Sequence, residues 1–293
     1  MGATRKAARP SRRRVIALAA AVVLLLLAGG GLLAHGWFRG WFVAELTPAE
    51  LDRLLRPGYQ VLRPDGDGPF PAVVQFHACA GVSENQRVWA RAFRSAGWAS
   101  VVVDSLGPRE LSWESVCDGT SLLGSERAGD VAVALAHVRG LPFVDRERIV
   151  LAGWSHGGWS IMDLLAMDPR RELPHNLTEM PADGLAGLAG LLFVYPYCGF
   201  GTRAEPWPIR VPALFVLAGG DQVAPPGECS AIVRELEALG HAVDVVTIDG
   251  VRHSFDEPVH ADGTSSNYDP EATERAHGIA LEFLAELTGE RSR

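Results

Sequence analysis

The signature spacings of metal sites are missing from this sequence. Its 293 residues include only four cysteines, with no C-x-x-C pair and no H-E-x-x-H motif. Zinc sites in proteins depend on such closely spaced ligands, so the sequence gives no support for a metal centre, and we expect no cofactor. Internal repeats and low-complexity tracts are also missing, which excludes an organisation as a repeat array.

Basic residues are concentrated at the N-terminus. The first 14 residues contain no acid and six basic residues, namely Arg5, Lys6, Arg9, Arg12, Arg13 and Arg14. Because the whole chain carries a net charge of −8 and these six carry +6, the remainder carries −14. An acidic domain without a basic stripe argues against a nucleic acid as a partner.

One long apolar run, residues 15–34, follows these basic residues. Twenty apolar residues are long enough to cross the hydrocarbon core of a membrane. The basic run would stay on the cytoplasmic side, which would place the rest of the chain outside, in a periplasm or the extracellular space. The alternative is a secreted protein whose signal peptide is cleaved, because residues 15–28 also have the length of a signal-peptide core; no clean small-x-small cleavage site follows.

The remainder of the chain alternates strand and helix patterns. The strands include nearly continuous apolar runs such as residues 99–104, a pattern typical of parallel strands that are covered on both faces. We therefore expect an α/β fold with a doubly wound, mostly parallel sheet and helices on both faces. The predicted organisation is a basic cytoplasmic tail (1–14), a transmembrane signal anchor (15–34), a linker with a short helix (35–57) and one α/β domain (58–293).

The most informative motif is G-x-S-x-G at residues 153–157, centred on Ser155. A strand pattern precedes it and a helix pattern follows it, which is the context that a nucleophile elbow requires. In such a turn the strained serine presents its hydroxyl, and the flanking glycines let strand and helix approach closely.

Two partners for Ser155 follow in the order that a serine triad on this kind of sheet requires. Asp221 lies in the turn after the apolar strand 214–218, and His253 lies in the loop after the strand 243–248. A serine hydroxyl is a poor nucleophile until an imidazole removes its proton, and the imidazole needs a carboxylate to fix its tautomer. We expect the oxyanion to be held by the backbone N–H groups of Cys79, in an early loop, and His156.

The chain resembles the dienelactone hydrolase family of α/β hydrolases over roughly residues 58–287. The segments that carry the resemblance are 71–74 with 77–81, then 103–109, 143–149 and 253–256. The resemblance implies an α/β-hydrolase fold and the hydrolysis of a small-molecule ester or related acyl bond. Three departures bear on the substrate: Ser155 stands where a cysteine nucleophile is typical, Ala78 where a glutamate is, and Glu257 where a substrate-binding arginine is. They point away from dienelactone and toward neutral or weakly polar esters.

Other assignments rest on fewer observations. His77, Trp154 and Arg109 are candidate substrate contacts, with the alternatives that His77 shapes the oxyanion loop, Trp154 packs the elbow and Arg109 forms a salt bridge. In an oxidising compartment Cys117 and Cys198, which both follow strands on the active-site side, are the preferred disulfide. Cys79 and Cys229 are expected to pair or to remain buried thiols.

Two further functions compete with a hydrolase: a catalytically silent binding or scaffold module, and an acyltransferase that uses the same triad. The ordered Ser155, Asp221 and His253 argue against the silent module, because a scaffold has no need of three groups placed for proton transfer. The oligomeric state is not predicted.

Overall fold

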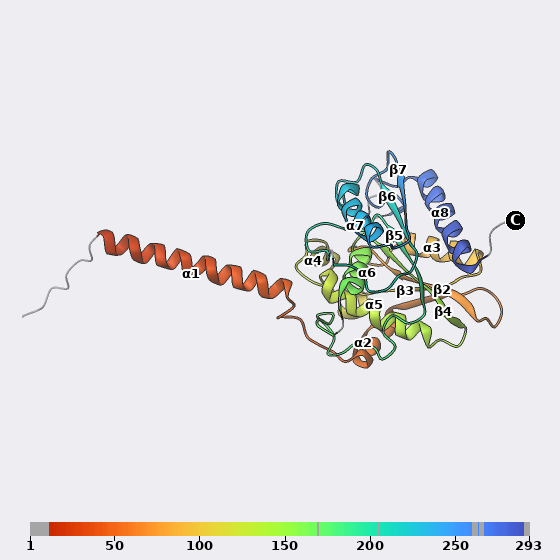
Figure 1. The fold of residues 1–293 in the computed structure, drawn as a ribbon, viewed down its shortest axis with the longest axis horizontal. Coiled ribbons are helices and arrows are strands. Elements are labelled where there is room, and N and C mark those ends of the chain that lie inside the picture. Colours follow the sequence, from red (N-terminus) through yellow and green to blue (C-terminus); the bar gives the residue numbers. More distant parts are fainter. Residues whose placement is uncertain (1–11, 169, 204, 260–262, 264–266, 290–293) are drawn as a thin grey trace, which may run out of the picture. The chain divides into compact units, whose positions relative to one another are not determined.

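The chain divides into two units, Met1–Phe42 and Val43–Arg293. The structure is a computed structural model and describes residues 12–168, 170–203, 205–259, 263 and 267–289 (Figure 1).

The first unit consists of one long helix, α1 (Arg12–Phe38). Its stretch Ala19–Phe38 has a mean hydropathy of 2.0 and is the one helix among the described residues long and apolar enough to cross a membrane. The helix extends beyond the predicted 15–34 at both ends, since the flanking residues contain no proline that would break it. Most of the basic tail, residues 1–11, lies outside the described residues.

The second unit is built on a mostly parallel sheet of seven strands. Their order is β1-β3-β2-β4-β5-β6-β7; β1 runs antiparallel to β3, and the other neighbours are parallel. The strands are β1 (Tyr59–Leu62), β2 (Phe70–Phe76), β3 (Ala99–Val103), β4 (Val144–Trp154), β5 (Leu188–Val194), β6 (Ala213–Ala218) and β7 (Val243–Ile248). The predicted parallel α/β sheet is therefore confirmed, with an antiparallel edge strand in addition.

Helices cover both faces of this sheet because successive strand side chains alternate between them. In β2, Val74 and Phe76 pack into one core and Val73 into the other. The first core is completed by α2 (Pro48–Leu55), α5 (Gly124–Arg139), α6 (His156–Ala166) and α7 (Pro226–Ala238), and the second by α3 (Glu84–Ser95) and α8 (Pro270–Thr288) (Figure 1).

Helix α2 belongs to the second unit, although the sequence places it in a linker. Thr47 caps it through a capping box with Glu50, and Pro48 is its first residue. Leu51 and Leu55 are fully buried in the first core. A short helix that the sequence did not predict, α4 (Trp113–Cys117), lies in the connection between β3 and α5.

Candidate active site

Ser155 occupies the sharp turn between β4 and α6. Its backbone has φ 49° and ψ −114°, a strained conformation for a non-glycine residue. A side chain on Gly157 would lie 2.0 Å from the carbonyl oxygen of Phe76, and one on Gly153 would lie 2.5 Å from the nitrogen of Gly158. The two glycines therefore allow the close approach that the G-x-S-x-G motif predicts.

A chain of hydrogen bonds joins the three predicted triad residues. The Nε2 atom of His253 lies 2.9 Å from Ser155 Oγ, and its Nδ1 atom lies 2.6 Å from Asp221 Oδ2. Because Nδ1 faces a carboxylate, it carries the ring proton, which leaves Nε2 free to accept the proton of the serine hydroxyl. The arrangement can generate a nucleophile at Ser155 Oγ.

Neighbouring loops hold the acid and the base of this chain in place. The other carboxyl oxygen of Asp221 accepts the N–H groups of Val223, at 2.8 Å, and Ala224, at 2.9 Å. The side-chain amide of Asn267 donates to the carbonyl of His253 at 3.0 Å. Asp221 is thus oriented by its own turn, and His253 by the segment that precedes α8.

A buried carboxyl group that sequence reasoning did not assign lies behind the histidine. Asp256 accepts hydrogen bonds from the indoles of Trp89 (2.7 Å) and Trp154 (3.0 Å), from the hydroxyl of Tyr195 and from the amide of Asn85 (3.4 Å). The Tyr195 ring packs edge-on against the His253 ring, with centroids 4.9 Å apart.

Burial and the neighbouring Asp256 raise the pKa of Tyr195, so this hydroxyl stays protonated and donates. The one sequence signal for the cluster is the position of Asp256, three residues after the predicted base.

The two predicted oxyanion donors come from segments that are packed against each other. Cys79 lies in the loop after β2, and His156 is the first residue of α6. The contact between Gly157 and the carbonyl of Phe76 brings the two segments together, and in the described part of the chain neither N–H donates to a backbone carbonyl.

Arg127 of α5 links these same two segments. Its guanidinium donates to the carbonyl of His77 at 2.8 Å, lies 3.1 Å from Nδ1 of His156, and donates through Nε to Ser105 Oγ at 3.0 Å. Burial, together with the Arg127 charge, lowers the pKa of His156 to about 3 and holds that of His77 well below its usual value. Both imidazoles are therefore neutral at physiological pH.

The structure corrects the three predicted substrate contacts. Trp154 is fully buried, and its indole donates to Asp256, so it packs the elbow. His77 is also fully buried and shapes the oxyanion loop: Nε2 accepts the N–H of Ser105 at 3.1 Å, and Nδ1 faces the carbonyl of Ala78. Arg109 makes two hydrogen bonds to the buried carboxylate of Asp130, at 2.6 and 3.0 Å, which is the salt-bridge alternative.

Aromatic residues flank the nucleophile on the side of α6. Tyr197 donates its backbone N–H to the carbonyl of Ser155 at 3.0 Å. Its ring lies 5.4 Å from that of Trp159, which in turn lies 5.0 Å from that of His156. Sequence reasoning missed this group, because nothing in the pattern shows that the loop after β5 returns to the elbow.

The predicted disulfide between Cys117 and Cys198 is wrong. The structure pairs Cys79 with Cys117, and Cys198 with Cys229. Cys117 follows β3 and Cys198 follows β5, and the sheet order places β2 and β4 between those strands. Cys79 follows β2, which lies beside β3, and Cys229 lies in the helix after β6, which lies beside β5, so each observed bond joins segments that follow neighbouring strands. Each bond joins a loop cysteine, Cys79 or Cys198, to a helical one: Cys117 is the last residue of α4, and Cys229 lies in α7.

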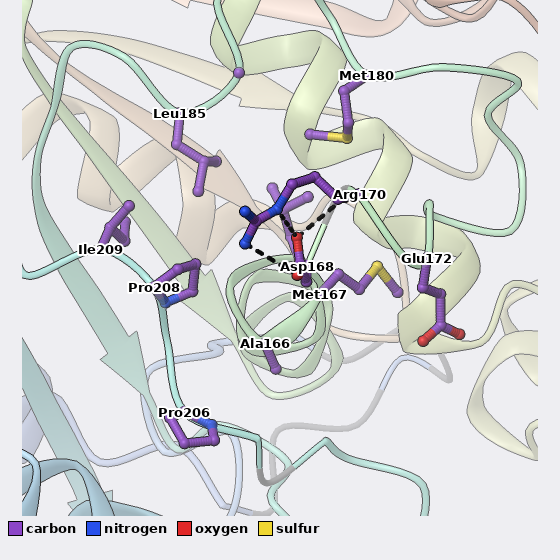
Figure 2. Close-up of a pocket in the computed structure, with 12 residues that line it drawn as sticks. Ala166, Met167, Asp168, Arg170, Glu172, Met180, Leu185, Pro206, Pro208 and Ile209 are labelled. Atoms are coloured by element: carbon purple, nitrogen blue, oxygen red, sulfur yellow. Dashed lines mark hydrogen bonds and ion pairs between the residues drawn. The ribbon is translucent and has the colours of Figure 1, made fainter.

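The cavity of about 570 Å³ shown in Figure 2 lies away from the triad. It is found at the C-terminal end of α6, whereas Ser155 precedes the N-terminal end of that helix, about 16 Å away along its axis. An ion pair between Asp168 and Arg170 lies among lining residues that are mostly apolar: Leu164, Ala166, Met167, Met180, Leu185, Pro206, Pro208 and Ile209.

Comparisons with known proteins agree with this geometry. The profile of the prolyl oligopeptidase family matches residues 83–171, and that of the dienelactone hydrolase family matches residues 184–288. A curated relative from Fusarium vanettenii, "Probable dipeptidyl-aminopeptidase B", is 29% identical over 142 residues, which are 45% of this chain and 15% of the relative. The chain therefore matches only a small part of that protein's length.

Solved structures resemble the second unit more completely. Esterase 2 of Thermogutta terrifontis, phosphoramylated by tabun, has a TM-score of 0.61 at 18% identity, with 80% of this chain and 90% of the esterase covered. A dienelactone hydrolase-like promiscuous phosphotriesterase from metagenomic libraries has a TM-score of 0.58 at 18% identity, with 78% and 92% covered. These similarities establish the fold, and together with the family matches they support a hydrolase of the esterase or peptidase kind.

Proposed function

The chain belongs to the dienelactone hydrolase family of the α/β-hydrolase superfamily, and we propose that it is a serine hydrolase that cleaves a carboxylic ester or related acyl bond. The observation that carries the proposal is the hydrogen-bond chain from Ser155 Oγ through His253 to Asp221, which begins at a strained elbow. In this proposal Ser155 is the nucleophile, His253 the general base and Asp221 the acid that orients it.

The reaction follows from the direction of the hydrogen bonds. His253 Nε2 takes the hydroxyl proton as Ser155 Oγ bonds to the acyl carbon, and the carbonyl π electrons move to the oxygen, where the N–H groups of Cys79 and His156 receive the charge. Collapse of this intermediate expels the alcohol, which takes the proton from His253 and leaves an acyl-serine. Water then repeats both steps, which releases the carboxylic acid and regenerates the serine.

We further propose that the substrate is a neutral or weakly polar ester. A carboxylate beside the nucleophile would need a fixed cation to offset the loss of its hydration. Arg109 is already paired with the buried Asp130, and Glu257 stands where the family's substrate-binding arginine is expected. The net charge of −14 beyond the first 14 residues adds long-range repulsion of anions.

The test is a comparison of three substrates with the full chain in detergent. We expect p-nitrophenyl butyrate to be hydrolysed with a kcat/KM at least about tenfold above that of p-nitrophenyl hemisuccinate, since desolvating an unpaired carboxylate costs at least about 1.4 kcal/mol. An aminoacyl p-nitroanilide is the third substrate, because residues 83–171, which include Ser155, match the prolyl oligopeptidase profile. Preference for the anilide would replace the esterase by a peptidase, and failure to cleave any of the three would favour a scaffold or an acyltransferase.

We also propose that α1 anchors the catalytic unit outside the cytoplasm. The length and hydropathy of its stretch Ala19–Phe38 support a single span. The two disulfides support an oxidising compartment for the second unit. The basic residues ahead of the helix favour a cytoplasmic N-terminus.

A fusion experiment tests this topology. We attach after Arg293 a reporter that is active only outside the cytoplasm, and we expect it to give a signal. In a separate measurement, the full chain is expected to remain in the membrane after carbonate extraction. The matched control replaces the six basic residues of the first 14 by glutamine, which removes the orienting charge and is expected to weaken the signal. A cytoplasmic signal, or release of a soluble shortened chain, contradicts the anchor.

A further inference from the structure

Arg127 is a buried cation that the catalytic scheme does not use. It is 0% exposed, and burial lowers its pKa to about 10, which still leaves it protonated at neutral pH. Among the ion pairs of the described residues, none joins Arg127 to a carboxylate within 4.0 Å; the nearby Asp130 is held by Arg109 instead. Burying a charge without a partner is costly, so a role that offsets the cost is needed.

The contacts of Arg127 converge on the two segments that would supply the oxyanion donors. On one side it holds the carbonyl of His77, two residues before Cys79, and on the other it holds the ring of His156, whose own N–H is the second donor. The bond from Nε to Ser105 Oγ fixes the plane of the guanidinium. One nitrogen of the guanidinium, Nη1, thus contacts both donor segments, and the Nε bond fixes the plane in which this nitrogen lies.

We propose that Arg127 is the positioning residue of the oxyanion hole: it fixes the loop of Cys79 relative to the start of α6 and supplies a positive charge behind both donors. The inference rests on the proposed function, since an oxyanion forms only if Ser155 attacks an acyl carbon. Its effect belongs to the transition state, where the negative charge develops, and not to the ground state. Loss of Arg127 is therefore expected to lower kcat and to leave KM nearly unchanged.

The first experiment replaces Arg127 by methionine, which has a similar length and no charge. Removing one donor of an oxyanion hole costs roughly 10²–10³-fold in kcat, and a misplaced pair is expected to cost about 10²-fold, with KM within about threefold. A trifluoromethyl ketone adds to Ser155 Oγ and leaves a tetrahedral oxyanion, so its inhibition constant is expected to rise by the same factor as kcat/KM falls. The control is Arg139→Met: Arg139 is also buried on the same helix, donates to the carbonyl of Ala186 and pairs with Asp183, at the end of α5 away from Ser155.

The second experiment replaces Arg127 by lysine and follows kcat/KM against pH. A buried ammonium loses its proton more readily than a guanidinium does. The alkaline limb, the part of the profile where kcat/KM falls as the pH rises, is therefore expected to begin at least about one pH unit lower than in the unmodified protein. The charged and titratable groups around position 127 are Asp104 after β3, Glu126, Asp130 and Arg109, with His77 and His156 on the oxyanion side. Burial raises the pKa of Glu126 to about 7, and the two imidazoles titrate far below that, so above pH 8 only the introduced lysine changes charge there.

The outcomes separate this inference from the proposed function. If the unmodified chain hydrolyses esters and folded Arg127→Met does so with the same kcat, the inference is overturned and the function stands. A rise in KM alone, or an equal loss of kcat in Arg139→Met, also overturns it. If Arg127→Met does not fold, the inference is tested with Arg127→Lys alone. An alkaline limb at the same pH as in the unmodified chain then overturns the inference. An unmodified chain that cleaves no ester overturns both.

Discussion

Replacing Ser155 by alanine is expected to lower kcat/KM for p-nitrophenyl butyrate by a factor of about 10³ or more, because the acyl-enzyme can no longer form. The hydroxyl of Ser155 is the group in hydrogen-bond contact with Nε2 of His253, at 2.9 Å. The strained turn holds this oxygen in place, and Ser155 is 5% exposed. In Ser155→Ala a water molecule would have to act as the nucleophile, and no backbone turn fixes its position. The measurement is the initial rate of p-nitrophenol release by the full chain in detergent.

A fluorophosphonate probe gives a second readout of the same prediction. It phosphonylates an activated serine hydroxyl and releases fluoride, so intact mass should show one adduct on the unmodified chain and none on Ser155→Ala. The control is Ser160→Ala, since Ser160 is buried on the same helix but its hydroxyl donates to the carbonyl of His156 at 2.8 Å. Turnover by Ser155→Ala at the rate of the unmodified chain, or loss of labelling in Ser160→Ala alone, would contradict the assignment.

Replacing Asp256 by asparagine is expected to lower the free energy of unfolding by about 3 kcal/mol. Both carboxyl oxygens accept: Oδ1 from Tyr195 and Asn85, and Oδ2 from Trp89 and Trp154. An amide group is nearly isosteric, but turned one way its NH₂ faces two indole N–H groups, which can only donate and lose their acceptor. Turned the other way, it faces the amide of Asn85 and the hydroxyl of Tyr195, which would have to rotate to accept and so give up its own donated bond. Asp256 is 2% exposed, and water cannot easily replace that acceptor.

Urea denaturation followed by tryptophan fluorescence measures this effect, and two of the donors, Trp89 and Trp154, report it directly. The matched control is Asp249→Asn, which removes the same charge from an exposed position close in sequence. We expect the denaturation midpoint of Asp249→Asn to stay near that of the unmodified chain, while that of Asp256→Asn falls. Equal midpoints for the two variants would show that the buried cluster contributes little to stability.

The relative order of Ser155, Asp221 and His253 was enough to predict that they meet. In a parallel sheet the carboxyl ends of the strands lie at one edge, so the residues that follow β4, β6 and β7 emerge on the same side of the sheet, and the loops after β6 and β7 carry the acid and the base to Ser155. The strand and helix positions followed in the same way from apolar periodicity, and the glycines at positions 153 and 157 from the needs of the turn.

Features that depend on the order of strands in space could not be predicted this way. The disulfide of Cys117 is an example, because the sequence shows that it follows a strand but not that this strand lies beside β2. The burial of His77 and Trp154 is another, since a position next to the nucleophile in sequence does not tell whether the side chain faces the substrate or the core. The donors of Asp256 come from separate parts of the chain, and no local pattern links them.

The placement of the triad on β4, β6 and β7 also determines when catalysis becomes possible during biosynthesis. The ribosome adds Ser155 first, Asp221 later and His253 last, so a nascent chain that already contains the elbow still has no base to activate it. Strand β6 must also pair with β5, and β7 with β6, before the three side chains come within reach of each other. A partly made chain is therefore expected to lack the proposed activity until the segment that carries His253 has been made and has folded.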